Sequence, residues 1–192
     1  MIATFEKGKC KFDGDDAVKF GYVKGEAVWA HVLGINQFGN YSIDVKGDAV
    51  VELEEELLEL RDSAYDAVIK ADPKKKPIKV DVLKQDDDGN KFIQFKLPEL
   101  NWKGEENKVK IYDASGKEVT DDWDELIGNG SIVKVKYMAK PYYMSSTKAV
   151  GISYRFYAVQ IIKLEEYSGG GDSGFGDETS DTGAIENDGG DY

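Results

Sequence analysis

Hydrophobic and polar residues alternate along much of this chain, with the two-residue period of half-buried β-strands. Short runs of this kind lie at residues 27–33, 41–46, 78–84, 91–97 and 108–112, and two longer runs lie at 131–138 and 150–164. An Asp-Gly step at Asp88-Gly89, between the runs 78–84 and 91–97, favours a hairpin turn. We therefore predict a mainly β chain.

One segment follows a helical period instead. Between residues 49 and 71, apolar side chains recur every three or four residues, at Leu53, Leu57, Leu60, Ala64 and Val68, and glutamates fill the opposite side. This pattern predicts an amphipathic helix that ends before Pro73, because proline disfavours helical geometry in the residue before it. Hydroxyl and carboxylate groups at residues 120–124 predict a second, short capped helix.

The two longest runs place particular side chains on opposite faces. In the run 131–138, Lys134 and Lys136 share one face, and Val133, Val135 and Tyr137 share the other. In the run 150–164, Arg155 and Tyr157 share a face, and the predicted core face contains Ile152, Tyr154, Phe156, Ala158, Ile162 and Leu164. If the two strands pair, Lys134, Lys136, Arg155 and Tyr157 gather on one sheet face. The sequence does not fix the register of that pairing.

Composition restricts the class of protein. The chain has 192 residues, of which 41% are hydrophobic, so it can bury a sizeable core as one domain. A single cysteine and a single histidine exclude a disulfide framework and a cysteine-based zinc cluster. No segment approaches the ~18 consecutive apolar residues of a membrane span, and the first residues lack a secretion signal. We expect a soluble protein in a reducing compartment, with no membrane partner.

Charge is distributed unevenly. The net charge is −12, yet residues 131–163 contain six cations and no Asp or Glu, interleaved with tyrosines. Cations that follow phosphates and rings that stack on bases are the two parts of sequence-independent binding to single-stranded nucleic acid. The candidate phosphate contacts are Lys134, Lys136, Lys140, Lys148 and Arg155, and the candidate stacking rings are Tyr142, Tyr143 and Tyr157. Alternatively, the tyrosines fill a small barrel and the lysines solvate its outside. Trp102, next to Lys103, is either a further stacking ring or a hydrophobic plug.

The last 25 residues differ from the rest. Residues 168–192 contain eight glycines, seven acidic residues and no Lys or Arg, a composition that predicts disorder. The folded domain is therefore expected at residues 1–167. The final residues include Asp188, Asp191 and the aromatic Tyr192. A tethered polyanion of this kind can occupy the cationic groove of its own protein until DNA displaces it. The more common role of such a segment is to keep the protein soluble.

Catalytic chemistry is weakly represented. Acidic clusters at residues 86–88 and 121–124 suggest a metal-dependent nuclease, but consecutive acids are also common in turns and at helix starts. His31 lies in an apolar run without an obvious catalytic partner. The sequence lacks a phosphate-binding loop and a dinucleotide-binding fingerprint. We therefore predict no catalytic residues, no metal, no cofactor and no enzymatic activity.

Four segments and the acidic C-terminal tail, taken in order, resemble bacteriophage single-stranded DNA-binding proteins. The segments are 39–45 (GNYSIDV), 111–117 (IYDASGK), 128–135 (GNGSIVKV) and 149–162 (AVGISYRFYAVQII). The resemblance implies an OB-fold-like five-stranded antiparallel barrel with an inserted helix.

In function, the resemblance implies a protein in the cytoplasm of the infected host cell that coats single-stranded DNA during phage DNA replication, recombination and repair. Its acidic tail is expected to bind phage DNA polymerase and helicase-primase through residues such as Asp188, Asp191 and Tyr192, and a homodimer is a further expectation. The alternative is a phage structural or assembly protein that uses a β-barrel and the tail for protein contacts.

Overall fold

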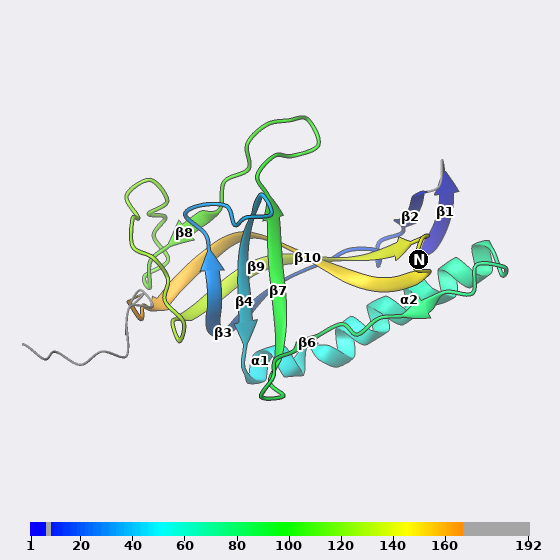
Figure 1. Cartoon of the computed structure of the whole chain (residues 1–192), viewed down its shortest axis with the longest axis horizontal. Helices are drawn as coiled ribbons and strands as arrows, with labels where there is room; N and C mark the ends of the chain where they lie inside the picture. Colours follow the sequence, from blue (N-terminus) through cyan, green and yellow to red (C-terminus); the bar gives the residue numbers. More distant parts are fainter. Residues whose placement is uncertain (7–8, 167–192) are drawn as a thin grey trace, which may run out of the picture.

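The computed structural model describes residues 1–6 and 9–166 of the chain, so the predictions for residues 168–192, including Asp188, Asp191 and Tyr192, lie outside the described residues. Five long strands make up most of the fold (Figure 1): β3 (Lys19–His31), β4 (Asn40–Lys46), β7 (Lys91–Pro98), β9 (Ile132–Met144) and β10 (Ala149–Lys163). The shorter elements are β1 (Ile2–Glu6), β2 (Lys9–Asp13), α1 (Asp48–Glu52), α2 (Glu54–Ala71), β5 (Ile78–Lys79), β6 (Lys84–Gln85) and β8 (Lys110–Tyr112).

The main sheet has the strand order β5-β10-β9-β3-β4-β7-β6, and β8 pairs with β10. Strands β7 and β10 also meet, in parallel, at the single pair Lys96 and Arg155. The predicted mainly β chain with an inserted helix is confirmed. The strands form a sheet that curves back on itself at one pair. The resemblance implied an OB-fold-like five-stranded antiparallel barrel, and the structure does not show a clearly closed barrel.

The main core lies between β3–β4–β7 on one side and β9–β10 on the other. Alternate residues of these strands supply it, among them Ile43, Val45, Ile93, Phe95 and Phe156, each with at most 1% of its surface exposed. Burial of each such side chain contributes about 1.5–3 kcal/mol. Because the apolar positions point inward, the polar positions between them point to solvent.

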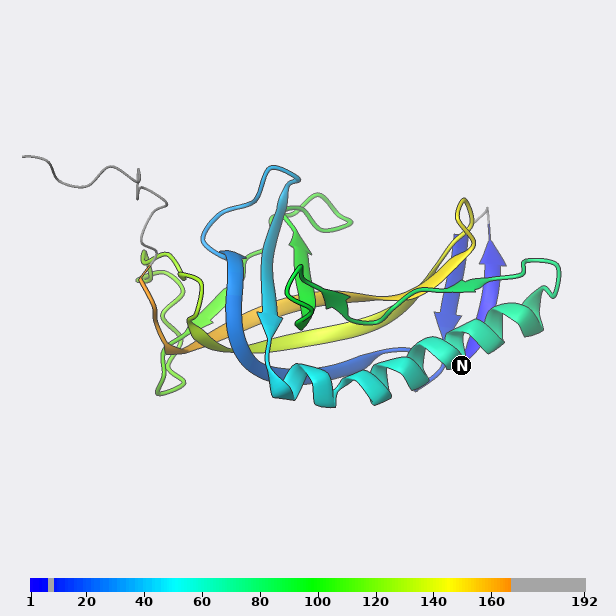
Figure 2. The same cartoon turned by 60° about the horizontal axis from the view of Figure 1, so that its bottom comes forward.

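The predicted helix is present as α1 and α2, which are separated at Leu53. Leu57, Leu60, Ala64 and Val68 are buried, as their spacing predicted. The helix ends at Ala71, and Asp72 takes an extended conformation before Pro73. Figure 2 shows α2 running along the extended part of β9 and β10, with the β1–β2 hairpin at its far end. These elements enclose a second, smaller core.

Strand β9 is longer than the predicted run 131–138, and β10 is shifted by one residue from the predicted run 150–164. Strand β9 continues beyond the end of the predicted run to Met144, and only residues 145–148 form the turn to β10. The prediction was wrong because Tyr142 and Tyr143 pair with Gly151 and Val150 and continue the ladder.

The predicted face assignment of β10 holds only up to Tyr157. Phe156 pairs with Tyr137 and Ala158 with Lys136, so Tyr157 is an extra residue that forms a β-bulge. A bulge shifts the alternation by one residue. Beyond it, Val159 and Ile161 occupy the core, whereas the predicted core residues Ile162 and Leu164 are only partly buried.

Residues 120–122 form a turn and residues 123 and 124 are irregular, so the predicted helix at 120–124 is not formed. Their polar side chains fasten this loop to β8 instead of capping a helix: Thr120 Oγ1 accepts the backbone N–H of Ile111 at 3.0 Å, and Asp121 forms an ion pair with Lys108. Among residues 1–6 and 9–166, no helix is long and apolar enough to cross a membrane.

Candidate nucleic-acid interface

The neighbouring strands β3, β9 and β10 place cations and aromatic rings on one outer surface. Lys134 and Lys136 alternate with buried Val133 and Val135 on β9 and are therefore exposed. On β3, Tyr22 pairs with Lys136, and its side chain is 59% exposed. We call the outer surface formed by these strands the basic–aromatic face; it comprises Tyr22, Lys134, Lys136, Lys140, Arg155 and Tyr157.

A hollow of about 360 Å³, the tyrosine hollow, lies in this face. The Lys134 Nζ atom is 5.2 Å from the centroid of the Tyr22 ring, and the Lys136 Nζ atom is 5.8 Å from it. The other residues that line it are Lys110, Tyr112, Gly116, Tyr157, Ala158 and Gln160. The described lining contains no carboxylate, so an anion that enters meets three ammonium groups and three tyrosine rings.

The cations of the tyrosine hollow are not equivalent. Lys110 forms an ion pair with Glu118 at 3.0 Å, and the Tyr112 hydroxyl donates to the same carboxylate at 3.2 Å. This pairing raises the pKa of Lys110 and lowers the pKa of Glu118. Lys134 and Lys136 have no ion pair among residues 1–6 and 9–166. Their charges are therefore available to a ligand, whereas that of Lys110 is already compensated.

A second hollow, of about 320 Å³, continues this surface where β7 meets β10. We call it the arginine hollow; Arg155, Lys140 and Lys96 contribute its cations, and its lining has no carboxylate among the described residues. Met138 also lines it and accepts a hydrogen bond at Sδ from the Tyr157 hydroxyl at 3.5 Å. Because Tyr157 lines the tyrosine hollow, this contact connects the two hollows.

Five of the eight predicted DNA contacts come together here. Lys134, Lys136 and Tyr157 line the tyrosine hollow, and Lys140 and Arg155 line the arginine hollow. The grouping of Lys134, Lys136, Arg155 and Tyr157 on one surface agrees with the pairing of β9 and β10.

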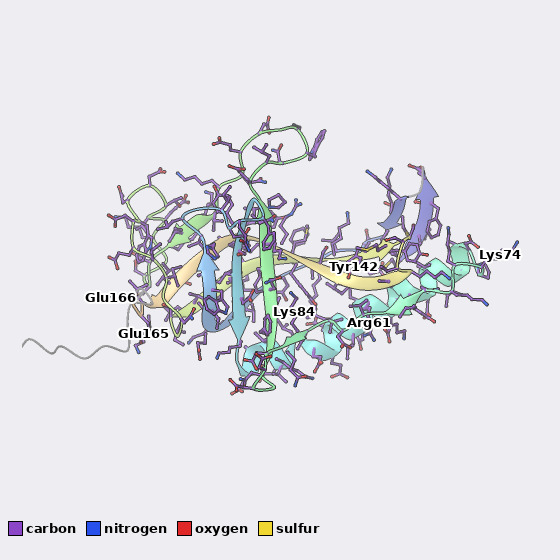
Figure 3. The ribbon with its side chains drawn as sticks, in the orientation of Figure 1. Arg61, Lys74, Lys84, Tyr142, Glu165 and Glu166 are labelled. Carbon is purple, nitrogen blue, oxygen red and sulfur yellow. The ribbon has the colours of Figure 1, made fainter. Side chains whose placement is uncertain are left out.

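The other three predicted contacts lie elsewhere. Tyr142 is half-buried on the extended part of β9 and lines a neighbouring cleft of about 780 Å³ together with Lys84 (Figure 3). Tyr143 is buried in the second core, where its ring packs edge-on against Phe5 at a centroid distance of 5.7 Å. Lys148 is exposed at the β9–β10 turn. Ser153, which lines the arginine hollow, is five residues beyond Lys148, so about 16 Å of strand separates Lys148 from that hollow.

Several residues of the hollows were missed in the sequence. Tyr22 shares one face of a strand-like run with Phe20 and Lys24, but only the pairing of β3 with β9 brings it to Lys134 and Lys136. Tyr112 reaches the tyrosine hollow because β8 pairs with β10. Trp102 is 90% exposed in the loop after β7, with Lys103 Nζ 5.3 Å from its ring centroid, so it is not a plug.

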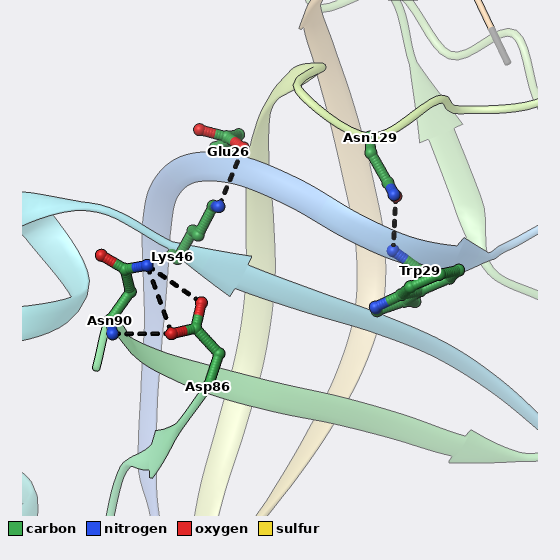
Figure 4. Close-up of polar contacts among 6 residues, drawn as sticks. All are labelled: Glu26, Trp29, Lys46, Asp86, Asn90 and Asn129. Atoms are coloured by element: carbon green, nitrogen blue, oxygen red, sulfur yellow. Dashed lines mark hydrogen bonds and ion pairs between the residues drawn. The ribbon is translucent and has the colours of Figure 1, made fainter. Parts of the chain in front are cut away.

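The acidic clusters have structural roles where they are described. Asp86 accepts hydrogen bonds from the backbone and side chain of Asn90 in the β6–β7 turn (Figure 4), and these bonds lower its pKa. Asp121 is paired with Lys108. Within residues 1–6 and 9–166, no group of three or more His, Cys, Asp or Glu residues is arranged to hold a metal ion.

Comparison with known sequences gives a partial match. No protein-family model matches the chain. The single-stranded DNA-binding protein of Enterobacteria phage T3 is 30% identical to it over 73 residues, which are 38% of this chain. The match covers 31% of the length of the T3 protein.

Comparison with solved structures extends the similarity to most of the fold. The crystal structure of gp2.5, a single-stranded DNA-binding protein encoded by bacteriophage T7, matches 88% of this chain and 99% of its own chain. The TM-score is 0.67 and the sequence identity is 23%, so the two proteins share a fold. The single-stranded DNA-binding protein of bacteriophage Enc34 matches 79% of this chain with a TM-score of 0.45. The resemblance to phage single-stranded DNA-binding proteins, predicted from the sequence, is confirmed.

Proposed function

We propose that this chain is a single-stranded DNA-binding protein, without enzymatic activity, that coats DNA exposed during phage replication and recombination. The observation that carries the proposal is the tyrosine hollow, where the ammonium groups of Lys134 and Lys136 lie within 6 Å of the exposed Tyr22 ring. The similarity to the single-stranded DNA-binding proteins of phages T3 and T7 supports it.

The basic–aromatic face has the chemistry that this function needs. Lys134, Lys136, Lys140 and Arg155 are exposed cations, and they neutralise phosphates without reading the sequence of bases. Tyr22 and Tyr157 offer ring faces to successive bases, and each stacked base contributes about 1–3 kcal/mol. The negative net charge of the whole chain does not oppose this, since the acidic residues are concentrated elsewhere.

We infer that the domain of residues 1–167 contains a partly open OB-type barrel, which is formed by β3, β4, β7, β9 and β10. The parallel contact between Lys96 and Arg155 supports this, because it joins the two ends of the five-strand order. The DNA then runs over the outside of the barrel and crosses this join at the arginine hollow.

The acidic tail has a regulatory role in this proposal. Residues 168–192 compete with DNA for the basic–aromatic face and, once displaced, recruit polymerase and helicase-primase through Asp188, Asp191 and Tyr192. Its charge, seven acids without a cation, supports the competition. A chain ending at residue 167 should bind oligo(dT) more tightly and bind those partners more weakly. Equal DNA affinity would leave the tail as a solubilising segment. Sedimentation of the full chain tests the predicted homodimer.

Fluorescence polarisation with labelled oligo(dT) tests DNA binding directly. The charge reversal Lys134→Glu/Lys136→Glu should abolish binding at moderate salt. The matched control is Lys70→Glu/Lys74→Glu, which changes the net charge equally at two exposed lysines near the end of α2, far from the hollows (Figure 3). Equal loss in both variants would contradict the proposed interface. The oligonucleotide should remain intact with magnesium, since cleavage would indicate a nuclease.

A further inference from the structure

Trp29 has an unusual conformation near the end of β3. Its φ angle is 51°, in the left-handed region that residues with a β-carbon rarely adopt. The pairing of β3 with β4 is irregular between Val28 and His31, so Trp29 lies in a bulge. Its side chain is 67% exposed. Bulges next to binding sites commonly redirect a side chain.

Asn129 holds this conformation. The backbone N–H of Trp29 donates to Oδ1 of Asn129 at 2.9 Å (Figure 4). The loop that carries Asn129 is itself fixed to β3, because Gly130 donates to the Ala27 carbonyl at 3.0 Å and Ala27 donates to the Ser131 carbonyl at 2.8 Å. Hydrogen bonds at Ala27 and Trp29 therefore hold the backbone that presents the indole to solvent.

Trp29 lines a hollow of about 420 Å³ that we call the tryptophan hollow. Phe38, 76% exposed, lines it as well, in a turn where Asn36 Oδ1 accepts the Phe38 N–H at 3.0 Å. The rest of the lining is polar and consists of His31, Asn36, Gln37, Ser42, Asp44 and Gln94. The hollow therefore suits a ligand with a planar ring, which can stack on the exposed rings, and a polar edge, which can hydrogen-bond to the polar side chains.

The tryptophan hollow adjoins the basic–aromatic face. Ser42, in its lining, pairs with Lys96 across β4 and β7, and Lys96 lines the arginine hollow. Gln94 lies two residues before Lys96 on the same face of β7, and its Oε1 accepts a hydrogen bond from Lys84 at 2.8 Å. Lys84 and Lys96, which can contact phosphates, therefore border a hollow whose two exposed rings can stack on a base.

We propose that the tryptophan hollow binds an unpaired base of the strand that crosses the basic–aromatic face, with the base stacked on Trp29. This inference rests on the proposed function and adds a subsite to it. Asn129 is the positioning residue, because it holds the Trp29 backbone without lining the hollow. A DNA base fits better than a protein partner, since the hollow continues a surface rich in cations.

Tryptophan fluorescence tests the subsite. The variant Trp102→Phe/Trp123→Phe leaves Trp29 as the single tryptophan, and its emission should be quenched as oligo(dT) binds. In the full chain, Trp29→Ala should weaken binding about 5- to 150-fold, the range expected for one lost stack. Trp29→Phe should recover most of that loss. Ile78→Ala removes an exposed apolar side chain outside the three hollows and should leave the affinity unchanged.

The variant Asn129→Ala tests whether Asn129 positions Trp29 without being required for folding. It should weaken oligo(dT) binding and Trp29 quenching while the circular dichroism spectrum stays unchanged. Normal binding without quenching, together with unchanged affinity in Trp29→Ala, would overturn the subsite and leave the proposed function intact. A loss of self-association in Trp29→Ala at unchanged DNA affinity would also overturn it and assign the hollow to a second copy of the chain. Absence of oligo(dT) binding by the unmodified chain would overturn both proposals.

Discussion

The double substitution Lys134→Ala/Lys136→Ala should halve the salt dependence of single-strand binding. Both ammonium groups are exposed, lie beside the Tyr22 ring and have no ion pair among residues 1–6 and 9–166. Each phosphate that a cation neutralises on a single strand contributes about −0.7 to the slope of log affinity against log salt concentration. Four such cations on the basic–aromatic face, with Lys140 and Arg155, give a slope of about −2.8, and the double variant retains about −1.4.

The expected difference is large enough to measure. Between 50 and 200 mM salt, a slope of −2.8 corresponds to a loss of affinity of about 50-fold, whereas −1.4 corresponds to a loss of about 7-fold. Fluorescence polarisation with a short labelled oligo(dT), titrated at four or five salt concentrations, gives both slopes. A short oligonucleotide limits the measurement to one protein molecule per strand.

Two controls test whether the slope reports these particular lysines. Lys110→Ala/Glu118→Ala removes an ion pair that is already neutral, of which Lys110 lines the same hollow, and should keep the original slope. Lys70→Ala/Lys74→Ala removes two exposed lysines outside the hollows and should also keep it. If the Lys134/Lys136 variant retained the full slope, counterions would be released elsewhere and the assignment of these lysines would be refuted.

Three further predictions concern stability and pH. Tyr154→Phe removes a hydroxyl that donates to the Val82 carbonyl at 2.6 Å, so unfolding should become easier by about 1–3 kcal/mol, measured as a lower thermal midpoint. Gly25→Ala would place Cβ 2.4 Å from the Lys46 carbonyl oxygen and should cost about 1–3 kcal/mol in urea unfolding, whereas Gly34→Ala, with nothing within 4 Å, should be tolerated. Burial raises the pKa of Asp44, so its ionisation destabilises the fold as pH rises; Asp44→Asn should therefore raise the thermal midpoint at pH 7, with a gain that vanishes below the ordinary value of 3.8.

The sequence alone was sufficient to predict features that depend on residues close together in the chain. The spacing of Leu57, Leu60 and Val68 predicted the buried side of α2, and the alternation of Lys134 with Val133 predicted its exposed side chain. Both patterns follow from the geometry of a single helix or strand. They are visible before any tertiary contact is known.

Features that depend on distant partners could not be predicted. The bulge at Tyr157 exists only in relation to β9, so the core assignment beyond it failed. Tyr22 became part of the site through the register of β3 with β9. The conformation of Trp29 is held by Asn129, 100 residues away in the sequence. Tyr143 was itself a predicted stacking ring, and only its packing against Phe5 shows that it is buried instead.

The region around the extended part of β9 and β10 and the region around the main core differ in the free energy of local unfolding. The second core packs that part against α2 and the β1–β2 hairpin; among the described residues it has eight buried members, and four of them are alanines. Small side chains remove little apolar area from water, so this end opens at a lower free energy than the strands around Phe95 and Phe156. Amide hydrogens at the far end should therefore exchange with solvent first, while the surface that carries Lys134 and Arg155 keeps its shape.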